Sequence, residues 1–197
     1  MSEIWGIILA AGESKRMGTP KMLMPYKGMT IIENVVAAVT TSDVDRTIAV
    51  LGSGSGDIHK VIKHLSIRCC INENYKNGML SSVKCGFNNL PEKFDAAIIF
   101  LGDQPMIEGS VINCLIDAYR KSGKGIVIPV SGNKRGHPLM IDSKYRNEIE
   151  NLDEGEGLRA LAQKYSDDVL EIEVNTSSIL KDIDTMDDYT NELKQIK

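Results

Sequence analysis

The segment Ile4-Trp-Gly-Ile-Ile-Leu9 is apolar apart from its glycine, and the small residues Ala10-Ala-Gly12 follow it directly. A short apolar run that ends in small residues is typical of a strand buried on both faces, the kind found in parallel sheets. The run Ala96-Ala-Ile-Ile-Phe-Leu101, which leads into Gly102-Asp103, has the same character. These two segments therefore predict buried strands over residues 4–9 and 96–101.

Strands and helices alternate along the rest of the chain. Apolar spacing predicts further strands at 47–51, 67–71, 125–130, 138–141 and 169–174, of which the segment 138–141 could return antiparallel. It predicts helices at 30–41, 57–65, 81–90, 111–121, 143–151, 156–165 and from 185 onward. Repeated strand–helix–strand units produce a mostly parallel sheet with helices on both faces. With no linker and no internal repeat, we expect one domain over residues 1–197 with a Rossmann-like, three-layer α/β/α fold.

Composition agrees with a folded domain and excludes several classes of protein. Hydrophobic residues make up 42% and charged residues 25% of the 197 residues, which excludes disordered and fibrous chains. The net charge of −4 argues against nucleic acid as a partner, and no apolar run approaches the roughly 20 residues of a membrane span. Met1-Ser-Glu3 lacks the start of a signal peptide, and the four cysteines form no C-x-x-C pair, so we expect a cytoplasmic protein with reduced thiols.

The loop after the first strand is rich in small and basic residues. It reads Ala10-Ala-Gly-Glu-Ser-Lys-Arg-Met-Gly-Thr-Pro-Lys21, which puts the cations Lys15, Arg16 and Lys21 close together. Ligands of open α/β sheets bind at the carboxyl ends of strands, and small residues let a ligand approach the backbone. The spacing matches neither of the common glycine-rich phosphate motifs. We interpret the loop as a polyphosphate site; a flexible basic loop is the alternative.

An acidic residue, Asp103, follows the strand at 96–101 in the turn Gly102-Asp-Gln-Pro105. A carboxylate at a strand end is well placed to hold Mg²⁺, which prefers oxygen ligands and phosphates. The alternative is a cap for the next helix. Because that helix is expected to start later, near Gly109, we favour a metal ligand.

Five segments, in order and spanning nearly the whole chain, resemble the molybdenum cofactor cytidylyltransferase branch of the nucleotidyltransferases. They are Leu9-Ala-Ala-Gly-Glu-Ser-Lys-Arg-Met-Gly18 with Lys21, Asn74-Tyr-Lys-Asn-Gly-Met79 with Ser81-Ser82, Leu101-Gly-Asp-Gln-Pro105, Arg135-Gly-His-Pro138 and Asp182-Ile-Asp-Thr185. The resemblance implies a nucleotidyltransferase fold and a cytidylyl transfer from CTP to molybdopterin cofactor with Mg²⁺ or Mn²⁺. It also implies a molybdenum hydroxylase apoenzyme as a downstream partner.

The resemblance also assigns roles to individual residues. It implies three catalytic residues: Arg16 and Lys21, which would hold the triphosphate, and Asp103. Asp103 and Asp184 would bind the metal, whereas Asp182 is not assigned and Asp187 and Asp188 are expected in the first turn of the last helix. The implied nucleotide-binding residues are Leu9, Ala10, Ala11, Gly12, Arg16, Lys21, Ser82 and Asp103.

Three of the implied residues have ordinary structural alternatives. Ser82 could be a helix N-cap rather than a base contact. Gln104, His137 and Arg159 are expected on the acceptor side, although His137 could instead fix a turn and Arg159 could be a surface arginine of an amphipathic helix.

The sequence shows no nucleophile arrangement and no zinc-ligand spacing, so the expected chemistry is positioning and charge neutralisation. A phosphate of the acceptor would attack the α-phosphorus of the nucleotide and expel pyrophosphate. Three alternatives remain open: a sugar or polyol phosphate as acceptor, GTP as donor, and a non-catalytic accessory protein that carries the cofactor to its target.

Overall fold

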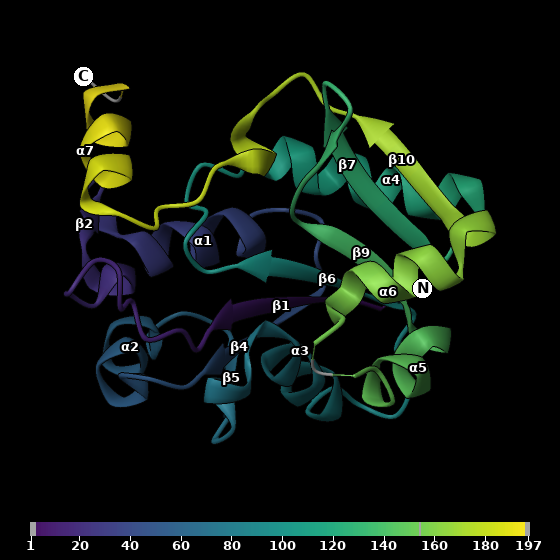
Figure 1. Ribbon diagram of the computed structural model, residues 1–197, viewed down its shortest axis with the longest axis horizontal. Coiled ribbons are helices and arrows are strands. Elements are labelled where there is room, and N and C mark those ends of the chain that lie inside the picture. Colours follow the sequence, from purple (N-terminus) through teal and green to yellow (C-terminus); the bar gives the residue numbers. More distant parts are fainter. Residues whose placement is uncertain (1–2, 154, 196–197) are drawn as a thin grey trace.

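The computed structural model describes residues 3–153 and 155–195, and it contains an eight-stranded, mostly parallel sheet (Figure 1). Seven strands follow one another in the order β10-β7-β9-β6-β1-β4-β5, and β8 pairs with β7. As expected, β9 runs antiparallel to both of its neighbours. The strands are β1 (Ile4–Ala10), β4 (Arg46–Leu51), β5 (Arg68–Ile71), β6 (Ala96–Leu101), β7 (Ile126–Ser131), β8 (Lys134–Arg135), β9 (Leu139–Asp142) and β10 (Val169–Glu173).

Helices cover both faces of this sheet, so the three-layer α/β/α architecture is confirmed. One face is covered by α1 (Ile31–Thr40), α2 (Ser55–Ile62) and α4 (Gly109–Ser122), and the other by α3 (Met79–Asn88), α5 (Arg146–Glu150) and α6 (Gly157–Lys164). The last helix, α7 (Met186–Gln195), lies beside a small hairpin of β2 (Pro25–Tyr26) and β3 (Met29–Thr30) that the sequence analysis did not predict. No helix in the described ranges is long and apolar enough to cross a membrane.

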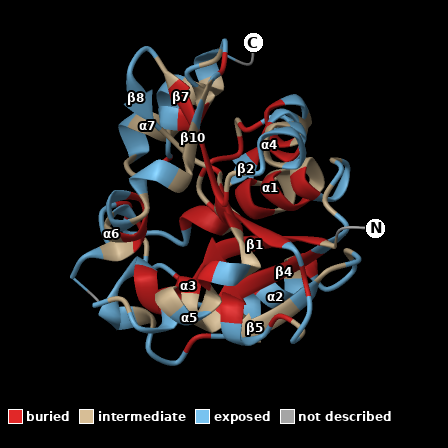
Figure 2. Cartoon of the chain, turned by 90° about the vertical axis from the view of Figure 1, so that its right-hand side faces the viewer, coloured by how far each residue is buried: buried red, intermediate tan, exposed pale blue. Residues whose placement is uncertain are grey.

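Strand β1 is buried along its whole length because it lies between two hydrophobic layers (Figure 2). Successive side chains of a strand point to opposite faces. Ile4 and Ile8 accordingly belong to the cluster that includes α1 and α4, whereas Ile7 and Leu9 belong to the cluster that includes α3 and α6. This explains why the first segment of the sequence is a continuous apolar run rather than an alternating one.

The strand order reverses at β1, which pairs with β4 on one side and with β6 on the other. From β1 the chain adds β4 and β5 outward and then returns to add β6 on the opposite side. Parallel strands diverge into different loops at such a switch point, which leaves a crevice at their carboxyl ends. The fold therefore places the loop after β1 and the turn after β6 at one edge of the sheet.

The C-terminal segment completes this edge through a small hydrophobic cluster of its own. Ile183 is fully buried against Met17, Tyr26 and Ile31, and the hydroxyl of Tyr189 in α7 donates to the carbonyl of Pro25 at 2.7 Å. The β2–β3 hairpin thus serves as the surface on which the C-terminal segment packs, next to the loop after β1.

Candidate active site

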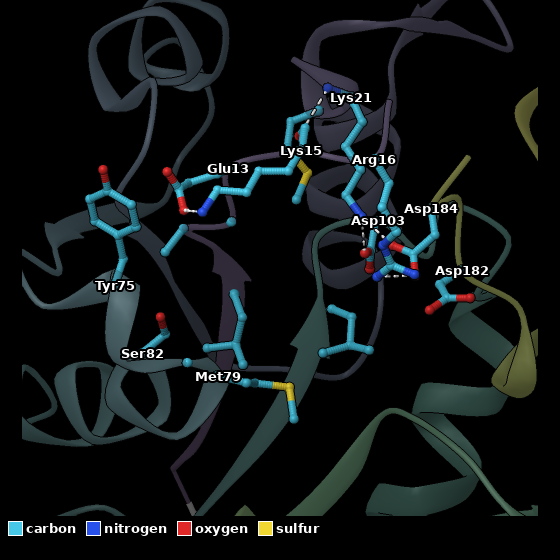
Figure 3. Close-up of a pocket in the computed structure, with 17 residues that line it drawn as sticks. Glu13, Lys15, Arg16, Lys21, Tyr75, Met79, Ser82, Asp103, Asp182 and Asp184 are labelled. Atoms are coloured by element: carbon cyan, nitrogen blue, oxygen red, sulfur yellow. Dashed lines mark hydrogen bonds and ion pairs between the residues drawn. The ribbon is translucent and has the colours of Figure 1, made fainter. Parts of the chain in front are cut away.

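A cleft of about 460 Å³ opens at the carboxyl ends of β1, β5 and β6 (Figure 3). Its walls come from the loop after β1, the start of α3, the turn after β6 and the segment before α7. The lining residues are Leu9, Ala11, Gly12, Glu13, Ser14, Lys15, Arg16, Lys21, Met22, Tyr75, Gly78, Met79, Ser82, Leu101, Asp103, Asp182 and Asp184. Arg16 and Lys21 of the loop after β1, Asp103 of the turn after β6 and Asp184 of the segment before α7 therefore lie around one cleft, although the three segments are far apart in sequence.

The loop after β1 is held in a compact turn. The amides of Met17 and Gly18 both donate to the carbonyl of Ser14, and the Ser14 hydroxyl accepts from the backbone amide of Lys21 at 3.2 Å. Ser14 adopts a positive φ of 52°, a conformation that residues other than glycine adopt rarely and at a cost in free energy. This turn brings Arg16 and Lys21 to the same side of the cleft, as Figure 3 shows.

The base of this loop is packed tightly on the turn after β4. A Cβ added at Gly52 would lie 2.8 Å from both the Cβ and the carbonyl oxygen of Ala11 and 2.8 Å from the Cβ of Tyr75. The glycine is therefore required because two walls of the cleft meet there, not because its backbone is strained.

Lys21 joins the two acidic segments of the site. Its ammonium lies 2.6 Å from Asp103 and 2.7 Å from Asp184, and Asp184 also pairs with Arg16 at 2.8 Å. Burial opposes the charge on Lys21, which is only 8% exposed, but the two carboxylates outweigh burial and raise the pKa of Lys21. Burial likewise disfavours ionised Asp184, but Lys21 and Arg16 reverse this effect and lower the pKa of Asp184. Lys21 and Asp184 are thus both charged at neutral pH.

A third carboxylate, Asp182, belongs to the same acidic group. One carboxylate oxygen from each of Asp103, Asp182 and Asp184 lies within 4.8 Å of the other two. Partial burial and the charges of Asp184 and Asp103 raise the pKa of Asp182. Carboxylate oxygens are the ligands that hard divalent cations prefer, so this donor set fits Mg²⁺ or Mn²⁺. The sequence analysis did not assign Asp182. Residues two apart in an extended segment point to the same side, so the position of Asp182 two residues before Asp184 could have indicated that both face the cleft.

The opposite wall of the cleft comes from Tyr75 and from the first turn of α3, where Ser82 lies (Figure 3). The interpretation of Ser82 as an N-cap is wrong, because α3 begins earlier, at Met79, and Gly78 occupies the N-cap position. Asn72, which directly follows β5, is only 4% exposed, and its amide donates to the hydroxyl oxygens of both Ser81 and Ser82. Sequence reasoning missed Asn72, since a single asparagine after a strand is most often a turn residue.

Four of the residues implied by the resemblance do not line the cleft. Ala10 is fully buried in β1, and Arg159 lies on the exposed side of α6. The side chain of Gln104 is buried beside a separate small cavity between α1, α4 and β6, lined by Val35 and Ile107 among others, which removes it from contact with an acceptor in the cleft. The chain makes a tight turn at the end of β6, where the backbone amide of Gln104 donates to the carbonyl of Leu101. This turn places the Gln104 side chain on the side away from the cleft.

His137 also lies outside the cleft lining. Burial lowers the pKa of His137, although its ring donates to the carbonyl of Ile99 and lies in the field of Asp103. Its backbone amide donates to the carbonyl of Ile179. These contacts fit the structural alternative, in which His137 fixes the turn before β9.

Comparisons with known proteins agree with the geometry of the cleft. A family described as the MobA-like NTP transferase domain matches residues 6–169. Over 93% of both chains, the protein is 26% identical to the nicotine blue oxidoreductase of Paenarthrobacter nicotinovorans. It is 28% identical to the molybdenum cofactor cytidylyltransferase of Escherichia coli, over 96% of this chain and 95% of that protein.

Among solved structures, Rv0371c from Mycobacterium tuberculosis is 25% identical and superposes with a TM-score of 0.87 over 98% of both chains. A second structure of that protein, in complex with manganese, has a TM-score of 0.83 at 23% identity and covers 98% of this chain and 99% of that one.

Proposed function

This chain belongs to the MobA-like NTP transferase family and is a nucleotidyltransferase, and we propose that it transfers the cytidylyl group of CTP to the terminal phosphate of molybdopterin cofactor. The products are a molybdopterin cytosine dinucleotide and pyrophosphate. One observation carries the proposal: Arg16 and Lys21 meet Asp103, Asp182 and Asp184 at one edge of the cleft, in the same space as the open backbone of Gly12.

The transfer is a single displacement at phosphorus. An oxygen of the acceptor phosphate forms a bond to the α-phosphorus of CTP, and the bond between that phosphorus and the bridging oxygen breaks to release pyrophosphate. Negative charge accumulates on the departing pyrophosphate, so cations beside the triphosphate lower the barrier. Arg16 and Lys21 supply two such cations. A dianionic acceptor phosphate needs no strong base, which agrees with the absence of a free histidine from the residues that line the cleft.

We propose Mg²⁺, or alternatively Mn²⁺, as the metal, with Asp103 and Asp184 as ligands. When bound, the ion neutralises charge on the triphosphate and orients it. Lys21 contacts both carboxylates, and it would exchange them for phosphate oxygens when the nucleotide binds.

Two further observations support the proposed base and acceptor. The Escherichia coli relative is named a molybdenum cofactor cytidylyltransferase, and the segment Ala10-Ala11 resembles cytidylyl-transferring members of the family. The Paenarthrobacter relative is named an oxidoreductase. An oxidation–reduction reaction does not call for three carboxylates beside two cations, whereas a triphosphate with its metal does, so the acidic group favours nucleotidyl transfer.

The proposal is tested by mixing the purified protein with Mg²⁺, one nucleoside triphosphate at a time, and molybdopterin, and measuring pyrophosphate and the dinucleotide product. We expect pyrophosphate with CTP and molybdopterin together, and little with GTP. Release with a sugar phosphate or polyol phosphate in place of molybdopterin would refute the assigned acceptor. Failure to release pyrophosphate with every nucleoside triphosphate and every acceptor tried would refute the transferase activity itself. Transfer of the product to a molybdenum hydroxylase apoenzyme tests the proposed partner.

A further inference from the structure

The amide of Asn72 lies behind the wall of the cleft and contacts two serines of α3. Its Nδ2 lies 2.9 Å from the hydroxyl oxygen of Ser81 and 3.0 Å from that of Ser82, and its Oδ1 accepts from the backbone amide of Asn74 at 3.0 Å. A backbone N–H can only donate, so the contact with Asn74 fixes which end of the Asn72 amide carries the oxygen. Both hydrogens of the Asn72 amide must then point to the two serines.

The two serine hydroxyls consequently accept one hydrogen bond each from Asn72 and must place their own protons elsewhere. The Ser81 hydroxyl donates to the carbonyls of Gly78 and Asn74, at 2.8 and 3.0 Å. Ser82 has no other hydrogen-bond partner among the described residues, it is only 4% exposed, and it lines the cleft. A buried hydroxyl whose proton lacks a partner costs free energy unless a ligand accepts it.

We infer that Asn72 is a positioning residue that makes Ser82 a hydrogen-bond donor toward the cleft, and that this donor recognises the nucleotide base through an acceptor atom on its edge. The inference rests on the proposed function and adds to it how the site contacts the base. Cytosine presents a carbonyl oxygen and a ring nitrogen, both acceptors, on one edge. The hydroxyl lies across the cleft from Asp103 and Asp184, which is where a base would lie with its triphosphate beside those acids (Figure 3).

Asn72→Asp tests this inference, because aspartate keeps the shape of asparagine and can still accept from Asn74 but cannot donate. Ser82 would then turn its proton toward residue 72 and present lone pairs to the base. We expect the Kd of CTP, measured calorimetrically without an acceptor, to rise about tenfold. Ribose 5′-triphosphate, which lacks the base, should bind wild type and variant within about twofold of each other.

A double-mutant cycle separates positioning from a merely structural role. Ser82→Ala alone should weaken CTP about three- to tenfold, and Asn72→Asp added to Ser82→Ala should weaken it no further. Ser81→Ala is the matched control, because Ser81 shares the Asn72 amide but donates its own proton to the carbonyls of Gly78 and Asn74 and does not line the cleft. Its effect on the Kd of CTP should stay within about twofold. If Asn72→Asp does not fold, Asn72→Ala in both backgrounds provides the same cycle.

Additive effects of Asn72→Asp and Ser82→Ala, or an equal loss of ribose 5′-triphosphate binding, would overturn the inference and leave the proposed function intact. Failure of the wild-type protein to bind CTP at all would overturn both.

Discussion

The backbone amide of Ile183 donates a hydrogen bond to the carbonyl of Asp103 at 3.0 Å. This bond joins the turn after β6 to the segment before α7, two parts of the chain that are far apart in sequence. Because the Ile183 side chain is fully buried, its neighbours Asp182 and Asp184 are left on the cleft side, beside Asp103. The acidic group is therefore built by tertiary packing of the C-terminal segment, and its function depends on that packing.

Replacing single carboxylates should separate metal ligands from ordinary surface acids. Asp103→Asn and Asp184→Asn keep the side-chain size but weaken oxygen ligation, so we expect kcat to fall about a hundredfold or more. Asp187→Asn is the matched control, because Asp187 is exposed in the first turn of α7 and lies outside the cleft lining. The rate of pyrophosphate release gives kcat for all three variants. Full cofactor maturation by Asp103→Asn would instead favour the accessory protein that carries cofactor without catalysis.

Lys21 should compete with a metal ion for the two carboxylates it bridges. Without nucleotide, its ammonium neutralises Asp103 and Asp184. Lys21→Gln removes that competitor, so we expect Mn²⁺ alone to bind about tenfold more tightly, while CTP binds more weakly for want of a phosphate contact. Free Mn²⁺ is measured by electron paramagnetic resonance.

Lys15→Gln is the control for this prediction, because Lys15 is exposed and pairs with Glu13 rather than with the acidic group. It should leave the affinity for Mn²⁺ unchanged. A weaker affinity of Lys21→Gln for Mn²⁺ would contradict the competition and indicate that Lys21 instead holds the carboxylates in place for the ion.

Two glycines near α2 should respond oppositely to alanine. Gly52→Ala puts a methyl group against the backbone of Ala11, and we expect a loss of about 1–3 kcal/mol in the free energy of unfolding together with a higher KM for CTP. Gly56→Ala meets nothing within 4 Å and lies within α2, so it should stabilise the protein by about 0.4–1 kcal/mol. Urea denaturation measures both. Equal changes in unfolding free energy for the two substitutions would contradict this prediction, because they would mean that the loop after β1 moves at Ala11 to accommodate the added methyl group without cost.

The start of α1 gives a pH-dependent contribution to stability. Hydrogen bonds from the backbone amide and then the hydroxyl of Thr30 lower the pKa of Glu33, and Thr30 and Glu33 together form a capping box. A carboxyl whose pKa is lowered in the folded state stabilises the protein above its unfolded pKa of about 4.3, and this contribution is lost as the pH falls through the lowered folded value.

The difference in unfolding free energy between wild type and Glu33→Gln should therefore be largest near neutral pH and shrink in acid. Thr30→Ala should cost about 0.5–2 kcal/mol at neutral pH. Denaturation series at several pH values test this, and a difference that grows as the pH falls would contradict the assignment.

The cysteines should differ sharply in reactivity. Burial, and then the Cys85 thiol 3.8 Å away, raises the pKa of Cys70 to about 12, whereas Cys114 is exposed. Because thiolates are the reactive form, we expect iodoacetamide near neutral pH to label Cys114 first and Cys70 only after unfolding in urea. Mass spectrometry of the labelled peptides measures this. Equal labelling rates of Cys70 and Cys114 in the native protein would contradict the packing of β5 against α3.

Much of the fold and part of the site were predictable because they depend on local patterns. The apolar runs at 4–9 and 96–101 are strands in the structure, and the helical spacing at 30–41 corresponds to α1. Arg16, Lys21 and Asp103 could be singled out because each follows a central strand, and the carboxyl ends of parallel strands meet at one edge of a sheet.

Other features depend on which distant segments touch, and no local pattern encodes that. Gln104 is adjacent to Asp103 in sequence but is buried on the other side of the turn, and Asn72 acts only through serines that α3 brings to it. Asp182 joins Asp103 only because Ile183 packs on the β2–β3 hairpin. Residue types and their periodicity thus determined the strands, the helices and the chemistry available at the strand ends. Tertiary packing decided which of those groups meet, because contact between remote segments follows from how buried side chains fit together.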